Sequence, residues 1–208
     1  MITIIDYEMG NLRSVEKAFE SLGFAARVSA DPADIPRADK LVLPGVGAFA
    51  DCVNNLRAGG FVAPLLEHVE SAKPLLGICV GMQMLFDESE EFGCHQGLGL
   101  IPGRVVRFPS GMVENGERLK VPHMGWNNLL IQQNSPLFAG VANESFVYFV
   151  HSYYCQAESQ ADVAASCRYG EVEFCASLWR DNIMATQFHP EKSQQVGLQI
   201  FRNFGELH

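Results

Sequence analysis

The sequence has no long apolar run and no excess of basic residues. Its 208 residues include 15 Lys and Arg against 24 Asp and Glu, a formal net charge of -9 at pH 7. Such a chain is repelled by phosphate backbones and anionic lipids, so we expect neither nucleic acid nor a membrane as a partner. No apolar stretch is long enough to cross a bilayer, and the N-terminus at Met1–Asp6 has no signal-peptide features.

Cysteine pairs are absent as well. None of the six cysteines forms a C-x-x-C motif; they are Cys52, Cys79, Cys94, Cys155, Cys167 and Cys175. We interpret them as reduced thiols of a cytoplasmic protein. Cys94 precedes His95, but the companion ligands that a metal site needs are not nearby, so we expect no metal and no cofactor.

What is present is an ordinary globular composition, with 48% apolar and 19% charged residues. The length predicts one domain over residues 1–208. The first half alternates between the two kinds of element, with strands expected at 2–6, 25–28, 40–43 and 74–78 and helices at 11–22, 48–57 and 61–71. This alternation predicts a largely parallel central sheet flanked by helices, with functional loops at the carboxyl ends of its strands.

The second half has a different pattern. Its apolar stretches predict strands at 103–108, 127–131, 146–150, 161–169, 174–179 and 183–188, followed by a helix at 196–204. Because turns rather than helices join these strands, we expect an antiparallel portion added to the parallel core. The predicted fold class is therefore α/β.

The segment Gly77–Gln83 has the pattern G-x-C-x-G, between a strand at 74–78 and a helix-like run at 82–86. A strand, a strained turn and a helix form a nucleophile elbow, in which glycines relieve the crowding around the nucleophile. The N-terminus of the helix would favour a thiolate at Cys79. A buried cysteine at the end of a core strand is the alternative interpretation.

A partner for such a nucleophile lies near the C-terminus. His189 and Glu191 follow an apolar stretch at 183–186, and their spacing can place both side chains on one side of the backbone. A cysteine nucleophile needs a base and a carboxylate that orients the base. His123 and His151 lack a carboxylate two residues further on, so we rank them below His189 as the base.

Together these motifs resemble the class I, triad-type glutamine amidotransferases, which have a flavodoxin-like single-domain fold. The resemblance extends over the whole chain. Within that family, Leu43–Phe49 is similar to the glutaminase subunits of imidazole glycerol phosphate synthases. The supporting stretches are Asp6–Val15, Pro122–Asn127, Tyr148–Tyr154 and Phe188–Ser193.

The resemblance implies that glutamine is hydrolysed to glutamate through a cysteine thioester. It also implies that ammonia passes, within a heterodimer, to a barrel-shaped cyclase subunit. The cyclase would make imidazole glycerol phosphate and aminoimidazole carboxamide ribotide in histidine biosynthesis. An amidotransferase paralogue that serves another synthase, or a non-catalytic binding subunit, is the alternative.

The resemblance also implies roles for individual residues. The catalytic residues would be Cys79, His189 and Glu191, and the oxyanion donors would be the amides of Val80 and Val46. Contacts to glutamine are expected from Gly45, Gly47, Gln83, His151, Ser152 and Tyr153, although strand-end packing would equally explain the last three. Trp126, Tyr148 and Lys192 would face the partner, although core packing is the default for both aromatic residues. The turn at 44–47 is either rigid or able to rotate its peptide.

Overall fold

A computed structural model describes residues 1–114 and 116–207. Its main sheet has the strand order β2-β1-β3-β4-β16-β15-β13-β7-β5-β6, with β14 pairing to β15 and β11 pairing to β14. The first half of the chain supplies one end of this sheet. Its parallel strands are β1 (Ile2–Ile5), β2 (Ala26–Ser29), β3 (Lys40–Gly45) and β4 (Leu75–Cys79).

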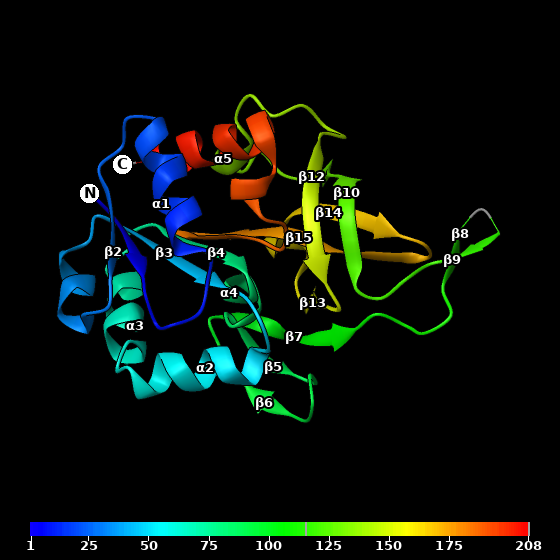
Figure 1. Ribbon diagram of the computed structural model, residues 1–208, viewed down its shortest axis with the longest axis horizontal. Coiled ribbons are helices and arrows are strands. Elements are labelled where there is room, and N and C mark those ends of the chain that lie inside the picture. The colour runs from blue at the N-terminus through cyan, green and yellow to red at the C-terminus, as the bar shows by residue number, and fades with distance from the viewer. Residues whose placement is uncertain (115, 208) are drawn as a thin grey trace.

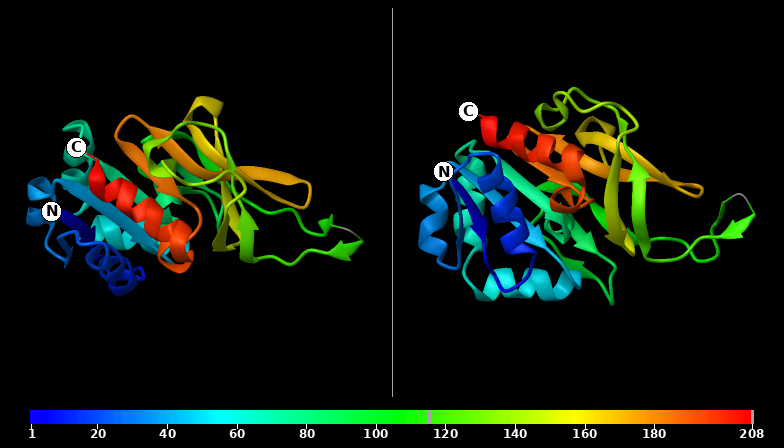
Figure 2. Two further views of the ribbon diagram at one scale, coloured as in Figure 1. Left: turned by 90° about the horizontal axis from the view of Figure 1, so that it is seen from above. Right: turned by 45° about the horizontal axis from the view of Figure 1, so that its top comes forward.

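Helices cover both faces of this parallel part (Figures 1 and 2). On one face lie α1 (Leu12–Ser21) and α5 (Gln194–Glu206), joined by Phe19 and Phe201, whose ring centroids are 4.6 Å apart. On the other lie α2 (Phe49–Ala58), α3 (Val62–Glu70) and a 3₁₀ helix at Pro32–Arg37. Because both faces are covered, β1 is buried throughout and β4 has five consecutive buried residues.

The antiparallel portion is joined to the parallel part through β16 (Ile183–Thr186). β16 runs parallel to β4 on one side and antiparallel to β15 (Val172–Arg180) on the other. The remaining strands of this portion are β5 (Phe86–Ser89), β6 (His95–Gln96), β7 (Ile101–Arg107), β11 (Leu130–Ile131), β13 (Tyr153–Ala157) and β14 (Val163–Tyr169). The carboxyl ends of β3, β4 and β16 are therefore neighbours, and this edge contains both predicted catalytic motifs.

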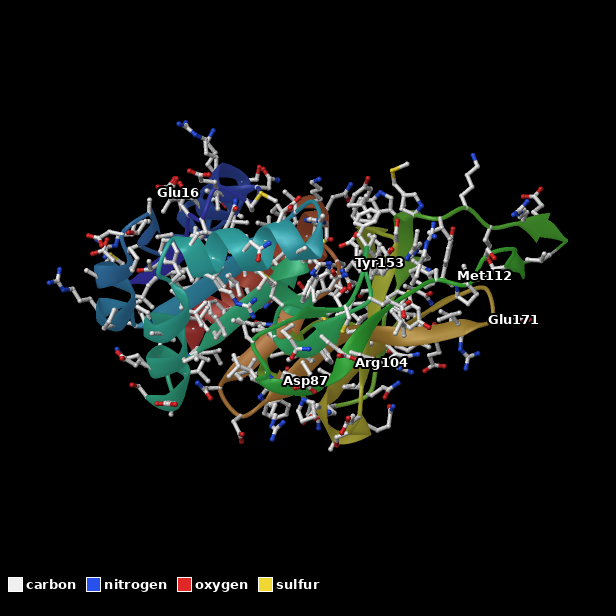
Figure 3. The ribbon with its side chains drawn as sticks, turned by 90° about the horizontal axis from the view of Figure 1, so that it is seen from below. Glu16, Asp87, Arg104, Met112, Tyr153 and Glu171 are labelled. Atoms are coloured by element: carbon white, nitrogen blue, oxygen red, sulfur yellow. The ribbon has the colours of Figure 1, made fainter. Side chains whose placement is uncertain are left out.

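Two smaller two-stranded sheets lie outside the main sheet. The ribbon, defined as β10 (His123–Asn128) paired with β12 (Phe146–His151), lies beside the edge where β16 ends. Beyond it extends the arm, β8 (Val113–Glu114) and β9 (Glu117–Arg118), which reaches outward (Figure 1). Figure 3 labels Met112, at the base of the arm, near Glu171 at the tip of the β14–β15 hairpin.

The structure confirms the expected α/β class and every predicted element of the first half up to residue 79, to within about two residues at each boundary. The helix expected at 82–86 was placed wrongly. It is α4 (Val80–Gln83), and Phe86 already begins β5. The helix stops because the carbonyls of Met84 and Leu85 accept hydrogen bonds from the N–H groups of Leu98 and Leu100, at 2.8 and 2.9 Å. Within residues 1–114 and 116–207, no helix is long and apolar enough to span a membrane.

Candidate active site

Cys79 lies at the last position of β4, in the strained conformation expected of a nucleophile elbow. Its φ of 55° and ψ of -113° are disfavoured for a residue with a side chain. Close packing explains the two flanking glycines. A Cβ on Gly81 would lie 1.9 Å from the Leu43 carbonyl oxygen, and one on Gly77 would lie 3.1 Å from the Cβ of Ala185. The G-x-C-x-G spacing therefore reflects the close packing of the elbow against β3 and β16.

His189 and Glu191 lie beside this elbow because β16, whose end they follow, pairs with β4. The Nδ1 of His189 is 2.9 Å from Glu191 Oε1, and both side chains are almost completely buried. Asn11 Nδ2, after β1, lies 3.4 Å from the same carboxylate oxygen. Burial lowers the pKa of His189, but the neighbouring Cys79 sulfur and Glu191 carboxylate outweigh that and raise it to about 10. The arrangement therefore favours the protonated imidazole of His189.

The two expected oxyanion donors flank the cysteine. Val80 begins α4, and Val46 follows β3 with its carbonyl accepting a hydrogen bond from Cys52 Sγ at 3.3 Å. The β3–β4 register places Gly45 opposite Cys79, and Leu41 N–H donates to Pro74 O at the start of the same ladder. The ladder ends at this pair, so Val46 and Val80 both lie just beyond it.

A cavity of about 290 Å³ opens beside Cys79. It brings together most of the expected site residues: Val46, Gly47, Cys79, Val80, Gln83, His151, Ser152, Tyr153, His189 and Lys192. Gly45 does not line the cavity. It packs beneath, where a Cβ would lie 2.7 Å from the N atom of Gly81.

Glu91 also lines this cavity and was not expected from the sequence. It follows β5, and its Oε2 accepts a hydrogen bond from the N–H of Phe49 at 2.7 Å. Gln187 was missed too, although its Nε2 is 3.8 Å from Cys79 Sγ. The adjacency of Gln187 to the Phe188–Glu191 motif was the one available signal for it. A carboxylate in a connecting loop gives no such signal for Glu91.

His151 lies on the wall of the cavity but is committed to another contact. Its Nδ1 donates to the Tyr153 carbonyl at 2.9 Å, and its Nε2 accepts from His123 Nδ1 at 3.0 Å. Burial lowers the pKa of His151 to about 3 and that of His123 to about 4. Both imidazoles are neutral near pH 7, which supports His189 over either as the base.

The three residues expected at a partner interface form one group beside the cavity. Trp126 is 45% exposed and pairs across the ribbon with Tyr148; their ring centroids are 6.1 Å apart. Lys192 Nζ lies 5.7 Å from the centre of the Tyr148 ring. The same face of the ribbon carries Met124 and Phe146, which are 66% and 60% exposed. Exposed apolar side chains thus extend from the mouth of the cavity along the ribbon.

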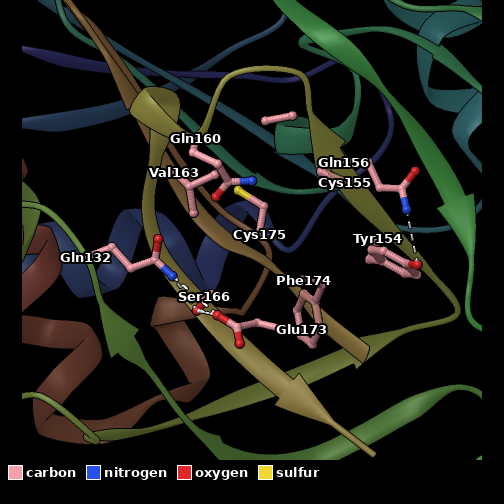
Figure 4. Close-up of a pocket in the computed structure, with 11 residues that line it drawn as sticks. Gln132, Tyr154, Cys155, Gln156, Gln160, Val163, Ser166, Glu173, Phe174 and Cys175 are labelled. Carbon is pink, nitrogen blue, oxygen red and sulfur yellow. Dashed lines mark hydrogen bonds between the residues drawn. The ribbon is translucent and has the colours of Figure 1, made fainter. Parts of the chain in front are cut away.

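A second hollow, of about 490 Å³, lies along β13, β14 and β15 (Figure 4). Its polar groups bond to one another: Gln132 Nε2 donates to Ser166 Oγ, and Ser166 Oγ donates to Glu173 Oε1, both at 2.8 Å. Its thiols, Cys155 and Cys175, have pKa values raised by burial. Its lining residues therefore include no cysteine beside a paired histidine and glutamate, unlike those of the Cys79 cavity.

Comparison with known proteins agrees with this geometry. Residues 3–206 match the sequence model of the family "Glutamine amidotransferase class-I". The chain belongs to this family. It is 65% identical, over the full length of both chains, to the imidazole glycerol phosphate synthase subunit HisH of Syntrophotalea carbinolica. It is 61% identical to the subunit of that name from Geobacter sulfurreducens, over 99% of this chain and 98% of the relative.

Solved structures support the fold. A crystal structure of a glutamine amidotransferase superimposes with a TM-score of 0.75 at 18% identity, covering both chains completely. The structure of PurLQS from Thermotoga maritima gives a TM-score of 0.72 at 18% identity, over 98% of this chain and 96% of that one. At such low sequence identity these structures are evidence for the fold alone. They agree with the predicted single-domain fold of this family.

Proposed function

We propose that the chain is the glutaminase subunit of an imidazole glycerol phosphate synthase, which hydrolyses L-glutamine and supplies ammonia for histidine biosynthesis. The observation that carries the proposal is the buried grouping of Cys79, His189 and Glu191 at the carboxyl ends of β4 and β16. Full-length identity of 65% to a relative named as this subunit supports the choice of pathway.

The reaction begins when the Cys79 thiolate attacks the carboxamide carbon of glutamine. The carbonyl π electrons move to oxygen, and the N–H groups of Val80 and Val46 donate to this oxyanion. Loss of one such donor typically costs about 3 kcal/mol of transition-state stabilisation. His189, as imidazolium, gives its proton to the departing nitrogen. Ammonia leaves, and glutamate remains bound to sulfur as a thioester.

Water completes the cycle. Neutral His189 takes a proton from the water as its oxygen attacks the thioester carbon, and the carbon–sulfur bond breaks to release glutamate and the thiolate. Glu191 accepts from Nδ1 of His189 throughout, which leaves Nε2 directed at the reacting atoms. Nε2 of His189 is buried and has no hydrogen-bond partner by geometric criteria within the described residues. An incoming substrate or water would satisfy it.

Glu91 and Gln83 are the groups suited to the amino-acid end of glutamine. The Glu91 carboxylate is the acidic group lining the cavity, so it pairs with the α-ammonium of the substrate. Gln83 uses its amide N–H groups within the protein, with the Tyr153 carbonyl and Gln187 Oε1 each 3.0 Å from Nε2. Its oxygen is left as an acceptor for the substrate.

The partner is a barrel-shaped cyclase subunit that binds the ribbon as a heterodimer. It adds ammonia to a phosphoribulosyl nucleotide. Met124, Trp126 and Phe146 supply the exposed apolar surface typical of an interface centre. Backbone hydrogen bonds join the ribbon to the segment that carries His189, the proposed base. The N–H of His189 donates to the Tyr148 carbonyl at 2.9 Å, and the N–H of Tyr148 donates to Ser193 Oγ at 3.0 Å. A partner that binds the ribbon therefore contacts a strand that is hydrogen-bonded directly to His189.

The proposed compartment is the cytoplasm. All six cysteines are free, and five of them are buried. Thiols in this state fit a reducing environment.

Replacing Cys79 with alanine tests the function. With the cyclase partner present, Cys79→Ala should abolish synthesis from glutamine, while synthesis from added ammonium salt should survive. The reason is that the partner performs the ring chemistry. Product formation from each nitrogen source is the measurement. Loss of both activities would assign Cys79 a structural role. An active glutaminase that a different synthase stimulates, but the cyclase does not, would identify a paralogue.

A further inference from the structure

Besides His189, the Cys79 sulfur contacts a buried side-chain amide. Gln187 follows β16 directly and is completely buried, with Nε2 3.8 Å from Cys79 Sγ. Its backbone N–H donates to the Ala176 carbonyl on β15 at 2.8 Å. This bond to the sheet therefore fixes the backbone of Gln187, which lies two residues before His189, the proposed base.

The surrounding hydrogen bonds determine which way the Gln187 amide points. The Tyr153 carbonyl can only accept, so the Gln83 group 3.0 Å from it is the NH₂. The same NH₂ lies 3.0 Å from the second amide, which must present its oxygen, Gln187 Oε1. The nitrogen of Gln187 is then the group turned toward sulfur. His151 Nδ1 also donates to the Tyr153 carbonyl, at 2.9 Å, and so helps to fix the position of that carbonyl.

We propose that Gln187 is a hydrogen-bond donor to the Cys79 thiolate, held in its donating orientation by Gln83. A donor favours the thiolate over the thiol because a charged acceptor forms the stronger hydrogen bond. Gln187 thereby raises the fraction of reactive nucleophile before substrate binds. This inference rests on the proposed role of Cys79.

Titratable groups also lie near the sulfur. They are His189 after β16, Tyr7 after β1, Cys52 on α2 and Cys155 on β13. Burial raises the pKa of Tyr7 and of Cys155, and that of Cys52 to about 11, so these three groups are neutral near pH 7. Glu91 and Lys192 also line the cavity beside Cys79, and Gln187 complements these two and His189 as an uncharged donor.

Alkylation of the isolated chain tests the proposal without glutamine or partner. The rate at which iodoacetamide modifies Cys79 is measured between pH 5 and 10 by mass spectrometry of the peptide that contains it. In Gln187→Met the midpoint of the pH–rate profile should rise by about one unit, which slows alkylation about tenfold at pH values below both midpoints. The exposed thiol of Cys94 is the internal standard and should react at an unchanged rate.

Thr186→Val is the matched control. Thr186 is equally buried, and its hydroxyl donates to the Phe188 carbonyl at 3.0 Å rather than to sulfur. Its profile should coincide with that of the wild type. An unchanged profile in folded Gln187→Met, or an equal shift in Thr186→Val, would overturn the proposal.

A second variant covers the case in which Gln187→Met does not fold. Gln83→Met leaves Gln187 in place but removes the group that orients its amide. A smaller shift in the same direction is expected, and no shift would contradict the proposal. Because no glutamine is hydrolysed, a failure here leaves the proposed function standing, whereas an inactive wild-type glutaminase would remove that function itself.

Discussion

At the scale of single residues, the site is a balance between burial and partners. Removing His189 from water alone would lower its pKa, yet the neighbouring Cys79 sulfur and Glu191 carboxylate raise it. The proton is therefore held on the imidazole, next to the Cys79 sulfur. This is the form that a thiolate nucleophile needs for attack and for protonation of the leaving ammonia.

His189 and Glu191 should contribute unequally. His189→Ala removes the acid and base, so we expect kcat for glutamine hydrolysis to fall by roughly two to four orders of magnitude. Glu191→Gln keeps a group beside Nδ1 and should leave more activity, because Asn11 also bonds to position 191 and helps to hold the side chain. Steady-state ammonia release is the measurement. Equal and slight losses in both variants would point to another base, with His151 the next candidate.

Whether the sequence could predict a site residue depends on how far apart in the sequence its contacts lie. The triad could be predicted because each motif is local: the G-x-C-x-G spacing and a histidine two residues before a glutamate. The bond from Gln83 to Gln187 joins residues that are 104 positions apart, and Glu91 reaches the cavity from a loop. The first contact depends on the β4–β16 pairing and the second on where the chain runs after β5, and no local pattern encodes either.

At the scale of elements, the turn at the end of β3 contains two glycines, which leave its backbone freedom to change conformation. Gly47 has a φ of 90°, and Gly45 packs against the N atom of Gly81. The last pair of the β3–β4 register is Gly45 opposite Cys79, so the Gly45–Val46 peptide lies at the end of the ladder. We expect this peptide to rotate so that the Val46 N–H joins that of Val80 at the cavity. Two flanking glycines give it that freedom.

Val46→Pro tests this rotation. Proline deletes the proposed donor and fixes φ, so partner-stimulated glutaminase activity should be largely lost while Cys79 still reacts with iodoacetamide. Val46→Ala keeps the N–H and is the matched control, which should retain stimulation. A folded Val46→Pro protein that the partner stimulates fully would show that the Val46 amide is not the second donor.

Elements were predictable where periodicity was strong. The alternation of β1 through β4 with their helices could be predicted because both faces of the sheet are covered and the strands are short apolar runs. β13 was missed because Tyr153–Ala157 is neither a clean apolar run nor an alternating one. The expected helix at 82–86 is shorter because the chain at Met84–Leu85 bonds to Leu98–Leu100, a tertiary interaction that overrides the local pattern.

At the scale of the whole molecule, the buried histidine pair links the ribbon to the main sheet. His123 on β10 stacks between Phe149 and Tyr169, with ring centroids 4.9 and 4.1 Å away, and bonds to His151 on β12. Asn127 Nδ2 lies 3.3 Å from the remaining nitrogen of His123. Each ring nitrogen of the pair has a partner while both rings are neutral, so the packing of the ribbon depends on their staying unprotonated.

Stability should therefore fall in mild acid. Burial lowers the pKa of His151 to about 3 and that of His123 to about 4, whereas an unfolded histidine titrates near 6.5. Below pH 6.5 these two histidines become protonated in the unfolded chain but stay neutral in the folded protein. The free energy of unfolding therefore falls by up to about 1.4 kcal/mol per pH unit for each histidine. His68, whose pKa burial also lowers, adds to the slope. His189 has the opposite effect. Because its pKa is raised to about 10 in the folded protein, its contribution to the free energy of unfolding is lost as the pH rises from about 6.5 toward 10.

Urea unfolding between pH 6.5 and 5 measures this slope, in a range above the titration of ordinary carboxylates. His123→Phe removes one of the two titrating rings of the pair and fills the same stacked position, so its slope should be smaller by up to about 1.4 kcal/mol per pH unit. Phe149→Leu is the control: it loosens the same aromatic cluster and lowers stability at every pH, but removes no titrating group. Parallel curves for His123→Phe and wild type would show that the pair does not control acid stability, whatever the difference in their absolute free energies of unfolding.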